Sequence, residues 1–484
     1  EILTDISGTI TAQLVVNDGL VDSEPDALMI SVLAEPPDPD PETFAPPVEL
    51  GVVSTIGDST AFLYTGDNPL QRGVAPGTIE MERAAVLRGR VLNRDGNPMP
   101  GVTVTVLNHP EYGSTRSRAD GMFDLAVNGG GSLVVNYDLP GFLTVQRRAR
   151  VPWQDYVVLP DVVLIPFDTR VTRVSPRRAR GFTVVQGSKV EDSHGERQVT
   201  LLVPPGMQSR MRLKDGRQTE LSDLSIRATE YTVGPNGPLA MPGELPPTSA
   251  YTYAVELSVD QAEDAGATTV EFDQPMPFYV DNFLDFPVGI QVPVAYYDRE
   301  QAAWVPTDDG RIIEILSVVG GVAEVDSTGG GGADNGVDIG MTEAERQSLA
   351  GMYGAGTTLQ RAEMTHFTPY DCNFGVVAEA GATDPGQPQS ENRDGRKPDD
   401  PCEGNGSIIE CENQILRERV EIVGTPFSLN YASDRVLGRN AGNNLEIFLS
   451  GESVPSVLKR IELEVYVAGR EFIQDFPPQP NQKF

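Results

Sequence analysis

Short runs of alternating apolar and polar residues, separated by turn-forming residues, dominate positions 89–153. The apolar positions of these runs are Val102, Val104, Val106, Phe123, Leu125, Leu133, Val135 and Tyr137. A period of two residues is typical of strands with one buried face. The turns between the runs contain Asp95-Gly96, Pro100-Gly101, Asp120-Gly121 and Gly129-Gly130, whose residue types favour tight turns. The pattern predicts a small antiparallel β-sandwich.

The order of these residues resembles a known family. Gly101 opens the run VTVTV, and Asp120-Gly121 stands just before Phe123 and Leu125, as in carboxypeptidase-regulatory, transthyretin-like domains. The continuation, Pro110 to Gly113 and then FDLAVNGG, is similar to the transthyretin-like domain of teneurins and of bacterial Rhs/YD-repeat proteins. In those proteins this domain stands just before a large β-shell, so the resemblance implies an architectural role without catalysis.

Composition bounds the fold and its partners. The chain has 484 residues, enough for about three domains, and its 39% hydrophobic content supports packed cores. A formal net charge of −33 repels phosphate backbones and anionic membrane surfaces. No stretch of 18 apolar residues occurs. We therefore expect no nucleic-acid partner and no membrane insertion. The charge suits a secreted bacterial surface, with binding of divalent cations as the alternative.

The N-terminal part is predicted as two segments before the sandwich. Residues 1–34 alternate on both sides of Asn17-Asp18-Gly19 and resemble the last hairpin of a polycystic-kidney-type, Ig-like module. We expect the other strands of that module to be missing and the chain to be a piece of a longer polypeptide; alternatively the hairpin docks on the next domain. Residues 35–84 are expected to form an extended, proline-rich acidic linker and an irregular strap.

The rest of the chain is also predicted to be β-structure, so the predicted fold is all-β, with tandem antiparallel sandwiches. After the transthyretin-like domain at 85–166, residues 167–380 form a β-rich middle domain, and 381–405 are a low-complexity linker. Strand-like runs in the middle domain are 199–207, 251–259, 286–298 and 302–316. One helix is predicted at 342–353, where Thr342 and Glu345 have the spacing of a capping box. Segments 228–234, 279–283 and 366–371 resemble the region preceding the shell in Rhs proteins.

Residues 406–484 resemble the plug domain of teneurins and the segment that opens the shell in Rhs proteins, with IVGTPFSLNYASDR at its centre. A further strand is predicted from Ile461 to Phe472, where apolar residues alternate from Ile461 to Val467. The resemblance implies that a plug places apolar side chains in the mouth of a shell. The residues implied for these contacts are Phe427, Leu429, Tyr431 and Leu463. No YD repeat occurs in the chain itself.

Catalytic patterns are sparse. The three histidines lie in different segments without zinc spacing, and His366 with Asp371 and Cys372 fits a packed corner better than a nucleophilic dyad. The carboxylate pairs, among them Glu191-Asp192, are expected to lie solvated in turns or linkers. Two clusters of arginines, at 147–150 and 170–180, are expected to form an internal salt-bridge surface or an interdomain seam.

No cofactor is expected, and no metal beyond weak calcium candidates. Those candidates are Asp326, Asp334 and Asp338 in a glycine-rich loop, whose ligand spacing falls short of a calcium loop. Cys402 and Cys411 are near enough in sequence for a disulfide, with Cys372 as a competing partner.

The sequence thus predicts a non-enzymatic part of a secreted or surface protein of bacteria. Its partners would be its own YD-repeat shell and the cargo inside, which this chain lacks. An adhesive or matrix-forming stalk, which could form homo-oligomers or bind a cell-surface protein, is the main alternative. A carbohydrate-active enzyme is a remote one, which would need a pocket with converging acids and an aromatic floor.

Overall fold

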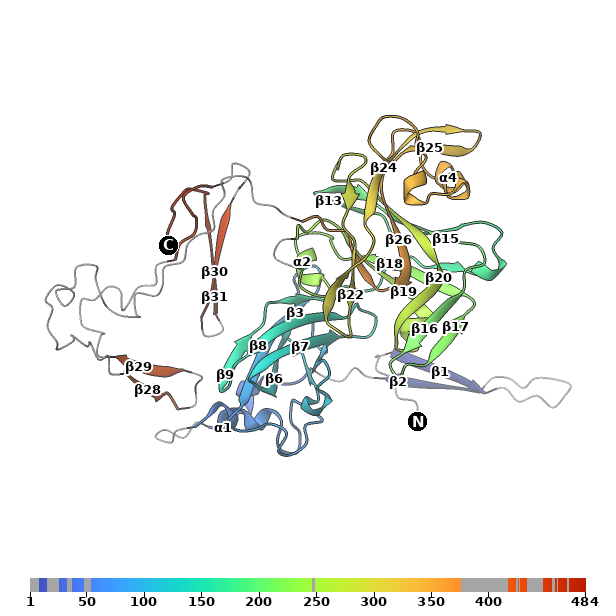
Figure 1. The fold of residues 1–484 in the computed structure, drawn as a ribbon. Helices are drawn as coiled ribbons and strands as arrows, with labels where there is room; N and C mark the ends of the chain where they lie inside the picture. Colours follow the sequence, from blue (N-terminus) through green and yellow to red (C-terminus); the bar gives the residue numbers. More distant parts are fainter. Residues whose placement is uncertain are drawn as a thin grey trace.

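The structure is a computed structural model. It describes residues 8–14, 26–32, 37–47, 54–245, 249–375, 417–423, 425, 427–432, 447–454, 458, 460–467 and 470–484. Strands in several antiparallel sheets make up most of this described part, with a few short helices (Figure 1). The prediction of tandem all-β sandwich domains is confirmed. Cys402 and Cys411 lie outside the described residues, so their pairing stays a prediction.

The first described element is a hairpin of β1 (Gly8–Leu14) and β2 (Asp26–Val32). The strands pair antiparallel, with Ala12 opposite Leu28, as the alternation predicts. The turn expected at residues 17–19 lies outside the described residues. Membership of an Ig-like module stays a prediction.

Residues 37–47 and 54–83 precede the first sandwich. They contain η1 (Pro41–Thr43), α1 (Ile56–Thr60) and η2 (Ala61–Leu63). Most of residues 37–47 are exposed, as expected of a linker, but Pro41 is buried and the Phe44 ring meets that of Phe62 edge-on at 5.6 Å. In the following irregular part, buried Gln71 donates to the main-chain oxygens of Tyr112 and Ala126 and so fastens the strap to the sandwich.

Two four-stranded sheets form the first sandwich. One contains β3 (Ala84–Leu92), β6 (Met122–Asn128), β9 (Asp155–Val158) and β10 (Val162–Val163), and the other β4 (Thr103–Val106), β5 (Thr115–Arg116), β7 (Gly131–Asp138) and β8 (Val145–Val151); η3 (Pro110–Tyr112) joins β4 to β5. The alternating apolar residues meet between the sheets, where the Phe123 and Tyr137 rings pack edge-on at 5.6 Å. A purely antiparallel sandwich was expected, but β9 and β10 run parallel to β3.

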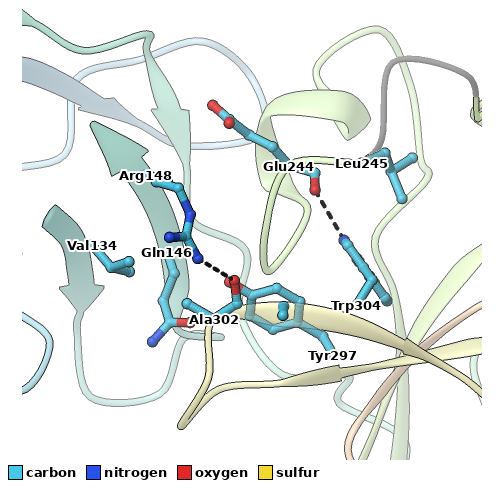
Figure 2. Close-up of a pocket in the computed structure, with 9 residues that line it drawn as sticks. Val134, Gln146, Arg148, Glu244, Leu245, Tyr297, Ala302 and Trp304 are labelled. Carbon is cyan, nitrogen blue, oxygen red and sulfur yellow. Dashed lines mark hydrogen bonds between the residues drawn. The ribbon is translucent and has the colours of Figure 1, made fainter. Parts of the chain in front are cut away.

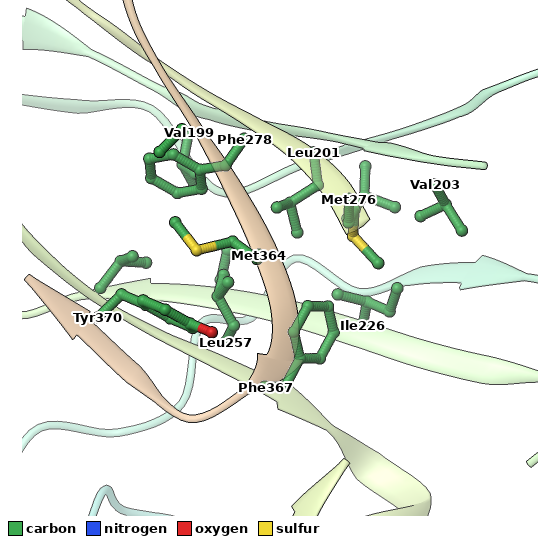
Figure 3. Packing of buried hydrophobic residues seen from close by; sticks show 14 of the residues in the cluster. Val199, Leu201, Val203, Ile226, Leu257, Met276, Phe278, Met364, Phe367 and Tyr370 are labelled. Atoms are coloured by element: carbon green, nitrogen blue, oxygen red, sulfur yellow. The ribbon is translucent and has the colours of Figure 1, made fainter. Parts of the chain in front are cut away.

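The middle region is a larger sandwich of a six-stranded and a nine-stranded sheet. The six-stranded sheet has the order β11 (Thr172–Val174), β18 (Leu224–Glu230), β19 (Ala254–Val259), β27 (Pro369–Asp371), β22 (Ala295–Asp298) and β23 (Ala303–Pro306). The nine-stranded sheet contains β12 (Thr183–Gln186), β15 (Val199–Val203), β20 (Ala267–Asp281), β26 (Thr358–Phe367), β24 (Gly310–Val319), β21 (Gln291–Val292), β16 (Ser209–Leu213), β17 (Gln218–Leu221) and β25 (Val322–Asp326). Figure 3 shows side chains of both sheets meeting in the core, such as Leu201 and Phe278 on one side and Ile226 and Leu257 on the other.

Smaller elements connect these sheets. They are the ribbon of β13 (Val190–Asp192) and β14 (Gly195–Arg197), the helices α2 (Gly237–Ala240), α3 (Asp260–Asp264) and α4 (Glu343–Ala350), and the 3-10 turns η4 (Pro176–Arg178) and η5 (Val337–Ile339). The predicted capping box is confirmed, because Thr342 and Glu345 exchange both hydrogen bonds at the start of α4. Two predicted strands are interrupted. Pro293, which has no N–H to donate, separates β21 from β22, and Asp308-Asp309 separate β23 from β24.

A buried ion network was not foreseen. Asp192 was expected to lie solvated in a turn, but its carboxylate accepts two hydrogen bonds from Arg197, at 2.8 and 2.9 Å. Arg197 is 1% exposed, also bonds Glu230 at 2.7 Å, and lies over the Phe283 ring. These hydrogen bonds hold the pKa of Asp192 below its usual range. The expectation was wrong because Arg197 of the facing strand β14 is itself buried, and the partner that completes its burial, Glu230 of β18, lies 33 residues further along the chain.

Two separate hairpins follow at the C-terminal end: β28 (Arg417–Glu421) with β29 (Ser428–Ala432), and β30 (Ile461–Val467) with β31 (Arg470–Phe476). The strand predicted from Ile461 to Phe472 is confirmed in part, because β30 ends at Val467 and β31, which begins at Arg470, pairs antiparallel with it. Within the second hairpin Ile461 lies opposite Phe476, whose ring packs edge-on against Phe484 at 5.9 Å.

Candidate functional site

The hairpin β28–β29 carries three of the four implied plug contacts: Phe427, Leu429 and Tyr431. Val420 lies directly opposite Leu429, and the main-chain N–H of Ile422 donates to the oxygen of Phe427 at 2.9 Å. Because side chains alternate along a strand, Val420 and Ile422 share a face with their partners Phe427 and Leu429. We call these four residues the apolar quartet.

The apolar quartet is exposed to solvent. The exposed fractions are 41% for Val420, 37% for Ile422, 45% for Phe427 and 46% for Leu429. Arg419 and Glu421, which flank Val420 in β28, form an ion pair with each other at 2.9 Å. The hairpin is therefore amphipathic. A two-stranded hairpin is marginally stable in water by itself, so an exposed apolar face on it is unusual.

Of the other two implied contacts, one lies further along the same strand and one lies in another sheet. Tyr431 belongs to β29 and pairs with Glu418, and Leu463 lies in the separate β30–β31 hairpin opposite Gln474. The structure thus brings together Phe427 and Leu429 and leaves Leu463 in another sheet. Sequence reasoning missed Val420 and Ile422. The signal was present in the sequence, because apolar Val420 and Ile422 alternate with Glu421 in the segment VEIV, as Phe427 and Leu429 alternate with Ser428.

A second feature is the seam between the first sandwich and the middle region. Leu92, Leu143 and Val163 of the first sandwich pack in one buried cluster with Tyr231 and Met241 of the middle region. An apolar cluster spanning both sandwiches favours a fixed arrangement of the two, because it is removed from water only while they are in contact.

Arg147 of β8 fastens this seam. The side chain is 4% exposed, and its guanidinium donates to the main-chain oxygens of Leu239 (2.7 Å) and Met241 (3.0 Å). Burial lowers the pKa of Arg147. Arg94 adds a second link, donating to the Glu230 oxygen at 2.9 Å. The seam expected for the arginines at 147–150 is confirmed for Arg147.

A pocket of about 300 Å³ opens along this seam (Figure 2). Arg148 donates to the Ala302 oxygen at 3.3 Å on one side, and the Trp304 indole N–H donates to the Glu244 oxygen at 3.1 Å on the other. The rings of Tyr297 and Trp304 meet edge-on at 5.1 Å. Gly243 is required beside them, because a Cβ there would lie 2.2 Å from the Tyr297 ring.

The pocket has an aromatic wall but one carboxylate. Its lining residues are Val134, Gln146, Arg148, Glu244, Leu245, Tyr297, Ala302, Ala303 and Trp304. Glycoside hydrolysis uses two carboxyl groups on opposite sides of the bond, and Glu244 is the single acid of this lining. The pocket therefore meets one of the two requirements of a carbohydrate-active site.

The residues considered for nucleophilic chemistry lie where β26 continues into β27. The His366 ring contacts those of Tyr296 and Tyr370 at centroid distances of 4.5 and 5.4 Å. Cys372 is 1% exposed, and burial raises the pKa of its thiol. The arrangement is an aromatic corner between two strands, in which the thiol is held neutral and out of reach of solvent.

The carboxylates of the calcium candidates accept hydrogen bonds from their own loop. Asp326 accepts from the main-chain N–H groups of Gly329 (2.8 Å) and Gly331 (2.6 Å), and Asp334 accepts from Ser327 and Thr328. These hydrogen bonds lower the pKa of Asp334 to about 2 against the opposing effect of burial. Asp338 accepts from the Ser327 hydroxyl at 3.1 Å. Within the described ranges no group of three acidic, histidine or cysteine side chains is placed to hold a metal ion.

Comparison with known families finds a match over the first sandwich. Residues 79–164 match the family model described as the teneurin TTR-like domain. Across the part of the chain that the structure describes, no helix is long and apolar enough to cross a membrane.

The matching relatives are teneurins. Teneurin-3 of Mus musculus is 37% identical over 109 residues, which is 22% of this chain and 4% of the relative. Teneurin-1 of Gallus gallus is 43% identical over 93 residues, 19% of this chain and 3% of the relative. Teneurin-m of Drosophila melanogaster is 37% identical over 98 residues, 20% of this chain and 4% of the relative. The match thus spans about 4% of the length of these relatives and supports a teneurin-like domain within the chain.

The solved structures that align with this chain are too dissimilar to show its fold. Hydroxyquinol 1,2-dioxygenase from Pseudomonas putida aligns at 12% identity and a TM-score of 0.16, covering 21% of this chain and 64% of the enzyme. A streptococcal ancillary pilin aligns at 10% identity and a TM-score of 0.16, covering 37% of this chain and 58% of the pilin.

Proposed function

We propose that this chain is a non-enzymatic, extracellular structural module whose C-terminal hairpins close a larger β-shell of the teneurin and Rhs kind, belonging to the same polypeptide. The shell would enclose a cargo, and the protein would act at a bacterial surface or after secretion. The observation that carries the proposal is the exposed apolar quartet on β28–β29. The teneurin TTR-like match at 79–164 supports it, because the plug follows such a domain in that family.

Energetics favour a docked state of the hairpin. Fully burying one such side chain contributes about 2 kcal/mol, so covering the remaining exposed fractions of the quartet contributes roughly 3 kcal/mol. This alone is too little to offset the entropy lost in association between separate molecules. A shell attached to the same polypeptide avoids most of that loss, since the docking partner is held at high effective concentration.

Two measurements test this function. The protein isolated from its native source should have a mass far above 52.2 kDa under denaturing, non-reducing conditions, because the shell and its cargo add polypeptide. In that native-size protein, F427E/L429E should expose the cargo to protease. The control S428E should not, because Ser428 stands between the two residues in sequence and lies on the other face of the hairpin. A mass near 52.2 kDa, or equal protection in both variants, would overturn the proposal.

An adhesive or matrix-forming stalk is the second candidate, and the seam favours it. Arg147, Arg94 and the shared apolar cluster join the two sandwiches into one stiff body, as a stalk needs. A released chain of about 52 kDa that forms oligomers at micromolar concentration would make this function the better one.

A further inference from the structure

Exposed basic side chains gather beside one edge of the middle sandwich. They come from β11, η4 and the segment after it, and from β16 with the turn after it. We call them the basic face: Arg173, Arg177, Arg178, Arg180, Arg210, Arg212 and Lys214. The arginines at 170–180 were expected to form an internal salt-bridge surface or a seam. For Arg173, Arg178 and Arg180 this is wrong, because the side chains are exposed.

Backbone contacts hold the two parts of the basic face together. The main-chain N–H of Gly206, just before β16, donates to the Pro176 oxygen at 2.8 Å. Arg210 lies opposite Glu220 across β16–β17, and Glu220 bonds Arg177 of η4 at 2.8 Å. Along β16, Ser209 is buried while Arg210 and Arg212 are exposed, as alternation requires.

The acids beside the basic face are already engaged. Glu220 pairs with Arg177 (2.8 Å), Glu271 with Arg212 (2.6 Å) and Asp215 with Arg217 (2.5 Å). Asp223 accepts from the Ser175 hydroxyl, and Asp273 from the main-chain N–H of Gln208. Five basic side chains have no carboxylate partner among the described residues: Arg173, Arg178, Arg180, Arg210 and Lys214. In a chain with 70 acidic and 37 basic residues, such a surplus of unpaired cations in one place is unexpected.

We propose that the basic face binds a linear anionic polysaccharide bearing carboxylate or sulfate groups. Four of the five unpaired groups are arginines, whose planar forks match such anions. The array is open and long, since Arg210 and Lys214 alone are about 13 Å apart along the strand. An extended polymer touches all of it, whereas a small ion touches one or two groups.

Nucleic acid fits the basic face less well. Among the described residues, no exposed phenylalanine or tryptophan ring on which bases could stack lies in β11, η4, β16 or the turns after them. The proposal does not depend on the plug function, because the basic face is on the middle sandwich and the apolar quartet is on β28–β29.

The test measures binding of the full chain to dextran sulfate and to neutral dextran at low salt by isothermal titration calorimetry. Dextran sulfate should bind and neutral dextran should not, and affinity should fall as salt rises. R178A/R210A should bind dextran sulfate about tenfold more weakly. The matched control is R150A, which removes an exposed arginine of β8 in the first sandwich and should bind like wild type. Thermal unfolding of each variant checks that the fold is intact.

Three outcomes would overturn the proposal. The first is no binding of dextran sulfate, or equal loss in R178A/R210A and R150A. The second is tighter binding of duplex DNA than of dextran sulfate at equal salt. The third is sedimentation showing a dimer that R178A/R210A abolishes, which would assign the basic face to an acidic surface of a second copy.

Discussion

Arg147 of β8 donates from its guanidinium to the main-chain oxygen of Leu239 at 2.7 Å, across the seam between the two sandwiches. A long side chain from a small domain thus satisfies a carbonyl group of its larger neighbour. Together with the bond to Met241, this contact makes the arrangement of the two sandwiches part of the folded state.

Replacing Arg147 by Met should destabilise the protein by about 3 kcal/mol, because two buried carbonyl groups lose their donor while the apolar volume is roughly kept. Urea unfolding measures the change. R150A, at an exposed position of the same strand, should stay within about 0.5 kcal/mol of wild type. Equal effects of the two substitutions would show that the seam contributes nothing to stability.

Gly89 should not tolerate a side chain. A Cβ at this position of β3 would lie 2.9 Å from the Phe123 ring and 3.3 Å from Leu159. Overpacking of this kind costs about 1–3 kcal/mol, so G89A should lower the thermal unfolding midpoint. G89A/F123L should recover part of the loss, since the smaller side chain leaves room. A loss from G89A that is just as large when Phe123 is already replaced by Leu would contradict this packing.

Asp371 should make stability depend on pH near neutrality. Burial raises its pKa to about 7, and its carboxylate accepts one main-chain N–H, from Ala295 at 3.2 Å. Because the folded state holds this proton more tightly than the unfolded state, stability should fall as pH rises from about 4 to about 7. Burial and the neighbouring Glu256 also raise the pKa of Glu263 to about 7, so Glu263 changes stability with pH in the same direction.

The variant D371N separates this effect from the rest. The amide keeps an acceptor for Ala295 but cannot ionise, so the variant should lose part of the slope of stability against pH and gain on wild type at pH 8. Urea unfolding across the pH range measures both. An unchanged slope in D371N would show that Asp371 does not titrate in this window.

Calcium should leave the stability of the glycine-rich loop unchanged. The carboxylates of Asp326 and Asp334 already accept hydrogen bonds from the loop, chiefly from main-chain N–H groups and the Ser327 and Thr328 hydroxyls. Thermal unfolding in millimolar calcium and in EDTA should give the same midpoint. A clear rise with calcium, lost in D334A, would instead show that the loop opens to take the ion.

Local signals in the sequence predicted local structure well. The Thr342–Glu345 capping box and the alternation from Ile461 to Val467 each depend on neighbours in the chain, and both form as predicted. The alternation at Val102–Val106 likewise predicts β4 and its buried face. The predicted helix ends early, at Ala350, where Gly351 takes the C-cap.

Long-range partners could not be predicted in the same way. The parallel pairing of β9 with β3 and the ion pair of Arg197 with Glu230 are set by the return path of the chain. The apolar quartet is intermediate. Phe427 and Leu429 followed from the family resemblance, while Val420 and Ile422 needed the register of β28 against β29.

Photo-crosslinking from position 429 tests the central claim most directly. A benzoylphenylalanine at Leu429, in the native-size protein, should react with residues of the same polypeptide beyond the plug, in β-strands of the shell. The same probe at Ser428, on the opposite face of β29, should react much less. Crosslinks from position 429 that join separate molecules, or equal yields from the two positions, would contradict the claim that the apolar quartet closes a shell.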